Sequence, residues 1–480
     1  DWSSDVCSSD LGVGAGEDRE GAEHQLEGAR AGLDELAGAP AREAGVRGAL
    51  GERERDELVV DLARPGYAAE PGQHEAGDEG AEQADHTGTL PRSGHPWGAR
   101  GPPPEGPRYP GGVLLLLACA SEPEPLRLRW VPGPGDDDWE HARAGLWWAL
   151  SLLGATPPAG EDALTLVDGY TFTLDPAGIG LPDEHVADLE AALVPLQEWA
   201  TEPVDLGLFL MATLYEPGRY YAITGACPTL DTWEARLEAT PEAYAVTLSL
   251  LVEGERLVEL NPLSTDTPLP AFAFRASEGE GSLTDGSFVA EEFEVMDMMP
   301  NGQQRFAVYG DDGALRAAAA ISAAGQPGRC MWCHEAILQR GTPKNASADG
   351  FLTTEEFLAE IDAGQAAIDT ARAGLGDTAI DWERYEQHEW AERLTRSYLE
   401  PSAERVAAEW GVDVAEVEVL GLGTHIDEEY PDLGDLLLRA DVDAARRDRE
   451  PGWAPYDAPM DDRFEDPGRT LFGTGALACE

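Results

Sequence analysis

Apolar positions repeat with two different periods along this chain. Between residues 126 and 325, most apolar residues alternate with polar or β-branched ones, which is typical of strands that bury one face. The pattern predicts strands at 162–175, 206–215, 219–225, 244–260, 271–276, 291–299 and 304–318. Asp312 and Gly313, inside the last of these, indicate a two-residue hairpin turn. Helical spacing in this part of the chain is confined to 139–158, which Gly154 and two prolines end, and to 183–200.

The period changes to that of helices after residue 350. Thr353 and Glu356 form a capping box, and a row of apolar residues on one helical face follows them. Gly364 interrupts this row one turn before Ile368. Further helices are predicted within 381–400, 402–421 and 432–448, and the tail after Glu450 has the composition of a loop.

These patterns predict an α+β protein. A β-rich domain with some helices is expected at residues 126–325, and a mostly helical region is expected at 326–480. We find no internal repeat. The length of 480 residues also favours more than one folded region.

The charge of the chain argues against binding to nucleic acid. Acids outnumber bases by 92 to 33, for a formal net charge of −59. Residues 402–421 have the spacing of a helix-turn-helix, with Gly411 at the turn and Asp413 capping the second helix. A helix pair that reads DNA presents cations to the phosphates, whereas this pair has Arg405 as its one base among five acids. A basic partner or a salty medium suits such a protein better.

The first 112 residues differ from the rest because they contain no phenylalanine and only four aromatic residues. A segment so poor in large apolar groups cannot offset the entropy lost when its backbone orders. Its first eleven residues, DWSSDVCSSDL, resemble a translated sequencing adapter. We therefore interpret residues 1–112 as a disordered or non-native segment and exclude them from the prediction of the fold.

A short apolar run, VLLLLACASEPEP, follows at residues 113–125. It resembles the end of a bacterial lipoprotein signal, in which Cys119 would be the lipidated residue and the segment behind it an extended tether. The run of apolar residues is shorter than such signals require, and a buried strand carrying a free cysteine is the alternative. The resemblance implies a protein anchored to a membrane by lipid, in the periplasm or at the cell surface. No apolar run of 18 residues is present, so a spanning helix is not expected.

The segment GQPGRCMWCHEAILQRG carries the clearest chemistry in the chain. Cys330, Cys333 and His334 have the spacing at which two thiols add to the vinyl groups of a porphyrin while the adjacent imidazole reaches its iron. A helical turn from Cys330 through Gln339 would hold all three on one side. A redox dithiol of the thioredoxin type would need a βαβ unit around it, and a zinc site would need a fourth ligand. Both remain alternatives.

This Cys-x-x-Cys-His motif resembles the attachment site of c-type cytochromes, over about a dozen residues. The resemblance implies covalent haem c at Cys330 and Cys333, with His334 as the proximal ligand of the iron. The first candidates for the sixth ligand are His425 and His388. The methionine candidates are Met296, Met298 and Met299, which lie in one short run, and Met460 near the end of the chain. Histidine or methionine at that position favours electron transfer, whereas an open position favours catalysis. Small cytochromes carry the motif near their start, and this chain carries it after a further domain.

The sequence thus predicts an extracytoplasmic haem c lipoprotein that transfers single electrons to a redox partner, which the negative charge suggests is basic. The alternative is a haem enzyme or sensor with an open iron position that acts on or binds a small molecule. Cys227 and Cys479 remain after these assignments, and a disulfide between them suits an oxidising compartment.

Overall fold

The computed structural model is an α+β protein, as the sequence predicts. It describes residues 125–132, 138–159, 163–200, 203–237, 241–249, 251–261, 272–322, 325–334, 336–340, 350–384, 386–427, 430–458 and 471. The predictions for residues 1–112, for Cys119 and for Met460 and Cys479 lie outside these ranges. None of the helices within them is long and apolar enough to cross a membrane.

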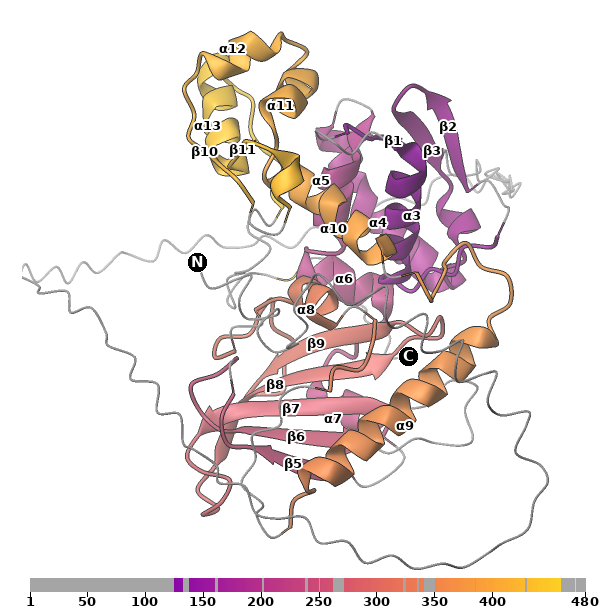
Figure 1. The fold of residues 1–480 in the computed structure, drawn as a ribbon, viewed down its shortest axis with the longest axis vertical. Coiled ribbons are helices and arrows are strands. Elements are labelled where there is room, and N and C mark those ends of the chain that lie inside the picture. The colour runs from indigo at the N-terminus through magenta and orange to yellow at the C-terminus, as the bar shows by residue number, and fades with distance from the viewer. Residues whose placement is uncertain are drawn as a thin grey trace, which may run out of the picture. The chain divides into compact units, whose positions relative to one another are not determined.

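A five-stranded antiparallel meander forms the larger sheet, with its strands in the order of the chain (Figure 1). Its members are β5 (Glu242–Val246), β6 (Arg256–Asn261), β7 (Ala273–Glu280), β8 (Val289–Met298) and β9 (Gln304–Gly310). Four of the strands predicted from alternation, at 244–260, 271–276, 291–299 and 304–318, supply all five. Consecutive residues in a strand point to opposite faces, so the two faces of this sheet carry different side chains.

One face of the sheet packs against α9 (Thr354–Ala373), which runs diagonally across it in Figure 1. Tyr244 of β5 stacks on Phe357 of α9 with ring centroids 4.2 Å apart. Gly364 lies where the helix approaches most closely, because a Cβ there would be 2.5 Å from Cζ of Phe272. The capping box of Thr353 and Glu356 begins this helix, as predicted.

The outer edge of β9 is covered by tyrosine hydroxyls. The amide N–H groups of Phe306 and Val308 donate to Tyr220 and Tyr221, at 3.1 and 3.3 Å. The turn that Asp312 and Gly313 were predicted to form returns the chain here, where Arg316 donates its N–H to the Val308 carbonyl at 2.9 Å. The strand thus has partners on both sides.

A second sheet, of four short strands, joins residues far apart in the chain. Its order is β2 (Leu164–Asp168), β3 (Thr171–Leu174), β1 (Leu126–Arg129) and β4 (Val204–Asp205). The helices α3 (Trp139–Ser151) and α4 (Asp183–Trp199) occupy the two segments whose spacing was helical. The short helices η1 (Pro176–Ile179) and α7 (Leu230–Glu234) complete the connections in this part of the chain.

Two predicted strands, at 206–215 and 219–225, are helices, and the prediction was wrong there. They are α5 (Leu206–Thr213) and α6 (Pro217–Thr224). Every residue of both helices is buried, so no polar face reveals the helical period. Local capping marks the true structure: Asp205 accepts hydrogen bonds from the N–H groups of Gly207 and Leu208. Glu216 caps α6, and Pro217 stands at the first helical position.

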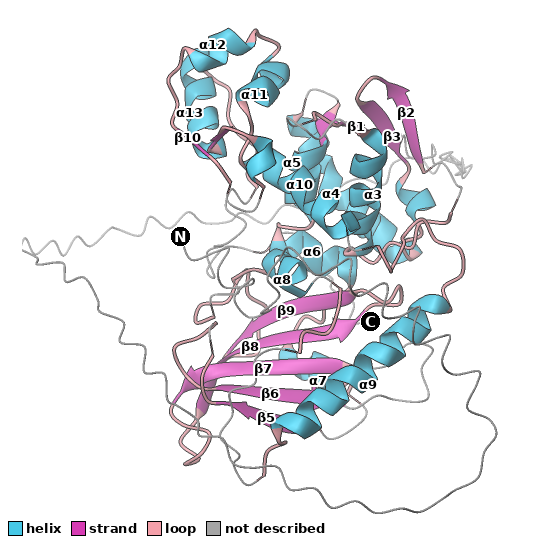
Figure 2. Cartoon of the chain, viewed as in Figure 1, coloured by secondary structure: helices cyan, strands magenta, loops and turns pink. Residues whose placement is uncertain are grey.

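The C-terminal part is mostly helical, as expected, and Figure 2 shows this distribution of helix and strand. It contains α10 (Glu386–Leu399), α11 (Ala403–Trp410), α12 (Val414–Glu418), α13 (Arg439–Arg449), η2 (Pro431–Leu433) and the short pair β10 (Thr424–His425) and β11 (Leu436–Leu437). Arg405, the one base of the helix-turn-helix pattern, is buried. It binds Asp205 and Glu409.

Candidate functional site

The Cys-x-x-Cys-His motif forms the end of α8 (Pro327–His334). The helix therefore begins three residues before Cys330 and ends at His334, not at Gln339 as the spacing predicted. Ala336 ends it with a left-handed φ of 60°, and Arg372 of α9 donates a hydrogen bond of 2.6 Å to the Ala336 carbonyl. Residues three and four apart share a helical face, so Cys330, Cys333 and His334 lie on neighbouring positions of one side.

His334 faces the edge of the larger sheet. Its ring lies 5.2 Å from the ring of Phe306 on β9, measured between centroids. Burial, reinforced by the nearby cation of Arg256, lowers the pKa of His334 to about 4. Its Nδ1 atom is buried and has no hydrogen-bond partner among the described residues. This imidazole is therefore neutral at physiological pH, which is the form that binds metal ions.

The three cysteines in the described part of the chain differ in oxidation state. Cys330 is a free, half-buried thiol, and burial, followed by the charge of Glu294, raises its pKa. Cys333 takes part in a disulfide, and so does Cys227. Cys227 is disulfide-bonded, and its pairing with Cys479 stays a prediction because Cys479 lies outside the described residues. A raised pKa makes Cys330 a poor nucleophile on its own.

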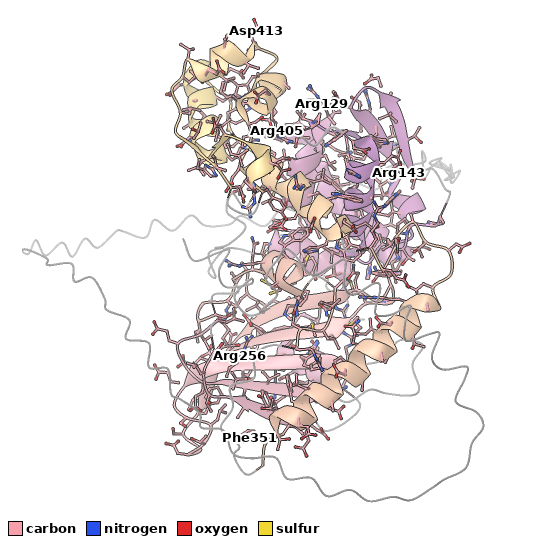
Figure 3. The ribbon with its side chains drawn as sticks, viewed as in Figure 1. Arg129, Arg143, Arg256, Phe351, Arg405 and Asp413 are labelled. Carbon is pink, nitrogen blue, oxygen red and sulfur yellow. The ribbon has the colours of Figure 1, made fainter. Side chains whose placement is uncertain are left out.

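A buried ion cluster lies on the face of the sheet beneath Cys330. Arg256, which Figure 3 labels, forms ion pairs of 2.5 Å with Glu278 and with Glu294. Burial raises the pKa of Glu278 to about 8, although Arg256 opposes the shift. No motif in the sequence marks these residues. Alternation along the strands places Arg256, Glu278 and Glu294 on one face, the face that also carries Phe306.

The opposite side of α8 carries Trp332. Trp332 and His334 are two positions apart on the helix, which separates them by about 200° around its axis, so they point away from each other. The indole of Trp332 donates a hydrogen bond to the hydroxyl of Tyr215. Its ring lies 5.1 Å from that of His388 on α10. Burial lowers the pKa of His388 to about 4, and a hydrogen bond with the backbone of Trp332 opposes this shift.

The candidates for the sixth ligand lie in different places. His388 contacts α8 on the side of Trp332, away from His334. His425 pairs with Glu400 through its Nε2 atom at 3.0 Å. Met296 lies directly across the sheet from Phe306, which contacts His334, and Met298 lies across from Gln304. Met299 is buried, and a Cβ at Gly154 would be 3.5 Å from its sulfur.

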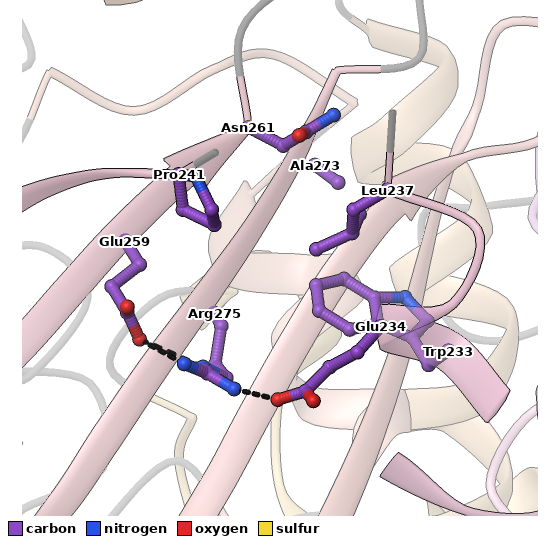
Figure 4. Close-up of a pocket in the computed structure, with 8 residues that line it drawn as sticks. All are labelled: Trp233, Glu234, Leu237, Pro241, Glu259, Asn261, Ala273 and Arg275. Atoms are coloured by element: carbon purple, nitrogen blue, oxygen red, sulfur yellow. Dashed lines mark hydrogen bonds and ion pairs between the residues drawn. The ribbon is translucent and has the colours of Figure 1, made fainter. Parts of the chain in front are cut away.

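A separate cavity of about 250 Å³ lies on the other face of the sheet (Figure 4). Its lining is Trp233, Glu234, Leu237, Pro241, Glu259, Asn261, Ala273 and Arg275. The guanidinium of Arg275 binds both Glu234 and Glu259, so its charge is already compensated. Because residues of this lining and residues beneath α8 alternate along the same strands, the cavity does not open toward the motif.

Comparison of the chain with protein-family models, curated proteins and solved structures finds no match. The functional assignment therefore rests on the motif and its surroundings. The described residues contain no group of three or more histidine, cysteine, aspartate or glutamate side chains placed to hold a metal ion by themselves. A porphyrin supplies four of the ligands of its own iron, so this finding bears on zinc more than on haem.

Proposed function

We propose that the protein is an extracytoplasmic haem c protein that transfers single electrons. The observation that carries the proposal is the helix α8, which presents Cys330, Cys333 and the neutral imidazole of His334 on one side. The buried Nδ1 of His334 leaves the ring in the uncharged state that an iron ligand requires. When bound, haem c supplies an iron that alternates between the ferric and ferrous states.

The cysteines attach the group in this proposal by adding S–H across its two vinyl groups, so each must be a thiol. Cys330 is in this form. Cys333 must first be released from its disulfide by reduction, which consumes two electrons and two protons per disulfide. The disulfides of Cys227 and Cys333 support an oxidising compartment such as the periplasm, where lipidation of Cys119 would anchor the chain.

If haem c binds, its sixth ligand would come from residues near His334. Among the candidates, Met298 and Met296 of β8 share the sheet face and the neighbourhood of Phe306 with His334. His388 is placed on the far side by its contact with Trp332, and His425 is engaged with Glu400. A methionine ligand favours electron transfer, whereas an open position would favour catalysis or sensing.

The proposed redox partner is a basic protein. Residues 1–118 contain 23 acids and 10 bases, which leaves 69 acids and 23 bases in the chain from Cys119 onward. A surface with this excess of carboxylates speeds the encounter with a cationic partner, and salt weakens the effect.

A second candidate is a protein in which these cysteines are structural. The participation of Cys333 in a disulfide favours it, because an oxidised sulfur cannot form a thioether. Such a protein would retain the fold and would contain no iron.

Expression in a bacterium that matures c-type cytochromes, followed by denaturing electrophoresis with haem staining, separates the two. We expect staining of the parent chain and of a Cys227→Ser control, and its loss in Cys330→Ser and Cys333→Ser. A colourless parent chain, produced beside a known cytochrome that stains, overturns the proposal. For the sixth ligand, the visible spectrum should change in Met298→Leu or Met296→Leu and stay unchanged in His425→Ala.

A further inference from the structure

A continuous row of aromatic rings leads away from the motif helix. Trp332, inside the motif, contacts His388, whose ring lies 6.3 Å from Trp148 of α3. Trp148 in turn lies 5.9 Å from Trp382, in the loop between α9 and α10. Each separation is within the range of 4.5–7 Å that defines direct contact between rings. Three segments distant in sequence thus meet in one row.

Packing alone does not explain the choice of tryptophan in this row. Buried indole N–H groups normally find an acceptor, because leaving one unpaired costs about 1–3 kcal/mol. The Nε1 atoms of Trp148 and Trp382 are buried and have no hydrogen-bond partner among the described residues. Phenylalanine would supply an aromatic ring at either position without this cost. Trp147, outside the row, has the same unpaired N–H, so what distinguishes the row is its ring-to-ring contacts together with indoles, which are easier to oxidise than phenyl rings.

The outer end of the row is accessible. Trp382 is half-buried, and the neighbouring Asp381 and Glu383 are exposed. Arg372 holds the ring in place, with Cζ 4.6 Å from its centroid. The same guanidinium donates to the carbonyl of Ala336, two residues after His334. One side chain thus connects the surface indole with the end of the motif helix.

We propose that Trp382, Trp148, His388 and Trp332 conduct single electrons between the protein surface and the motif at Cys330–His334. The inference rests on the proposed function, because the path requires a redox group at the motif that accepts the electron. The donor is a basic one-electron redox protein that docks against the exposed carboxylates beside Trp382. The path would let it deliver electrons without reaching the motif itself.

The electron count of the path is simple. The donor loses one electron, the group at the motif gains it, and the rings are unchanged after each passage. When an indole is oxidised, it usually releases its N–H proton to a nearby base. Trp148 and Trp382 have no such acceptor in the described residues, so the proton stays on the ring and no bond is broken.

The connectivity of the rings is testable in protein that carries no haem. A ruthenium polypyridyl photo-oxidant is attached at position 381 of an Asp381→Cys, Cys330→Ser variant, and a flash in the presence of a quencher produces ruthenium(III). This oxidant removes one electron from Trp382. A nitroso spin trap marks the tryptophans that become radicals, and peptide mass spectrometry identifies them. We expect trap adducts at Trp148 and Trp332 in addition to Trp382.

Two variants and one control decide the result. Trp148→Phe should confine the adducts to Trp382, and Trp382→Phe should lower those at Trp332 several-fold. The second variant guards against a folding defect of the first, because Trp382 is only half-buried. Trp390→Phe changes an indole that stacks on His141 outside the row, and it should alter nothing. Adducts confined to Trp382 in the parent, or unchanged at Trp332 in Trp382→Phe, overturn the path.

In haem-loaded protein that is labelled at Asp381→Cys and retains Cys330, flash-generated ruthenium(III) oxidises the ferrous haem, and the change in the Soret absorption reports the rate. Trp148→Phe should slow that rate several-fold, and Trp390→Phe should not. An unchanged rate overturns the path and leaves the haem assignment intact. If the chain never stains for haem, the proposed function is wrong. The trap adducts can then still show that the rings are connected, but the path would deliver electrons to no group at the motif.

Discussion

Arg405 binds both carboxylate oxygens of Asp205 through Nη2, at 2.8 and 2.9 Å, although 200 residues separate the two along the chain. Arg405 is only 2% exposed. Asp205 also caps the start of α5, so this ion pair ties α11 to a helix of the N-terminal half. Arg405 also donates to the carboxylate of Glu409 through Nε. Burial alone would raise the pKa of Glu409, but the cations of Arg439 and Arg405 outweigh this effect and lower it to about 2.

Replacing Arg405 by methionine should destabilise the protein strongly. The change removes the buried cation from the carboxylates of Asp205 and Glu409, which are 18% and 13% exposed, and loss of one partner of such a largely buried pair costs about 3–5 kcal/mol. Chemical denaturation measures this loss. Arg449→Met is the matched control, because Arg449 forms an exposed ion pair of 3.2 Å with Glu416. That change should cost no more than about 1 kcal/mol, and equal effects of the two variants would contradict the assignment.

Asp443 of α13 should make stability fall as the pH rises. Burial raises the pKa of Asp443 from 3.8 to about 6, although the charge of Arg439 opposes the shift. The folded protein therefore binds this proton more tightly than the unfolded chain, and its contribution to stability is lost as the pH rises from about 4 through 6. Asp443→Asn should remove this loss and gain on the order of 1–3 kcal/mol at pH 7. Urea denaturation at pH 4.5 and pH 7.5 provides the measurement, and a variant no more stable than its parent at pH 7.5 would refute the expectation.

His388 should have the opposite effect at acid pH. Burial lowers the pKa of His388 from 6.5 to about 4, so the unfolded chain binds a proton that the folded protein excludes. Stability present above pH 6.5 is then lost as the pH falls toward 4, by at most about 3 kcal/mol from this group. His388→Gln should reduce the slope of stability against pH in that range. It should not abolish the slope, because His334 has a similarly lowered pKa. Parallel profiles for variant and parent would exclude His388 as a source.

Gly364→Ala should destabilise the protein although alanine is the better helix former. A new Cβ would lie 2.5 Å from the ring of Phe272 and 2.9 Å from Leu338, so α9 would have to move away from the sheet. Overpacking of this kind costs about 1–3 kcal/mol, more than the gain of about 1 kcal/mol in helix propensity. Ala363→Gly, at an exposed position of the same helix, is the control and should cost about 1 kcal/mol through propensity alone. A rise in melting temperature for Gly364→Ala would show that the helix approaches the sheet less closely.

Elements with one exposed face were predictable from the sequence. The alternation that predicted a strand at 291–299 matches β8, and the capping box of Thr353 marked the start of α9. β9 is buried along its whole length, and the turn signal of Asp312 and Gly313 after it was the informative feature there. The helices α5 and α6 were not predicted, because a helix buried on every side has no exposed polar face that would display its period. Their caps, Asp205 and Glu216, were the informative residues.

The motif was predictable because its chemistry depends on spacing within five residues. Its surroundings were not, since the contacts of α8 come from β9, from Tyr215 after α5 and from α10, and each requires the tertiary fold. Phe306 and Arg256 reach the motif from different strands, and His388 reaches Trp332 from a helix more than 50 residues later. No local pattern records such proximity. The end of α8 at His334 also depends on Arg372, which binds the Ala336 carbonyl from α9.

The hydroxyl groups of Tyr220 and Tyr221 along β9 bear on how two copies of this chain can associate. An uncapped edge strand is a template on which another chain adds a strand of its own, and it is a common starting point for aggregation. At β9 the outward N–H groups of Phe306 and Val308 are already bound. The other edge, at β5, is covered in part, since the Leu352 N–H donates to the Ala243 carbonyl at 2.8 Å, so strand addition to the meander is restricted at both ends.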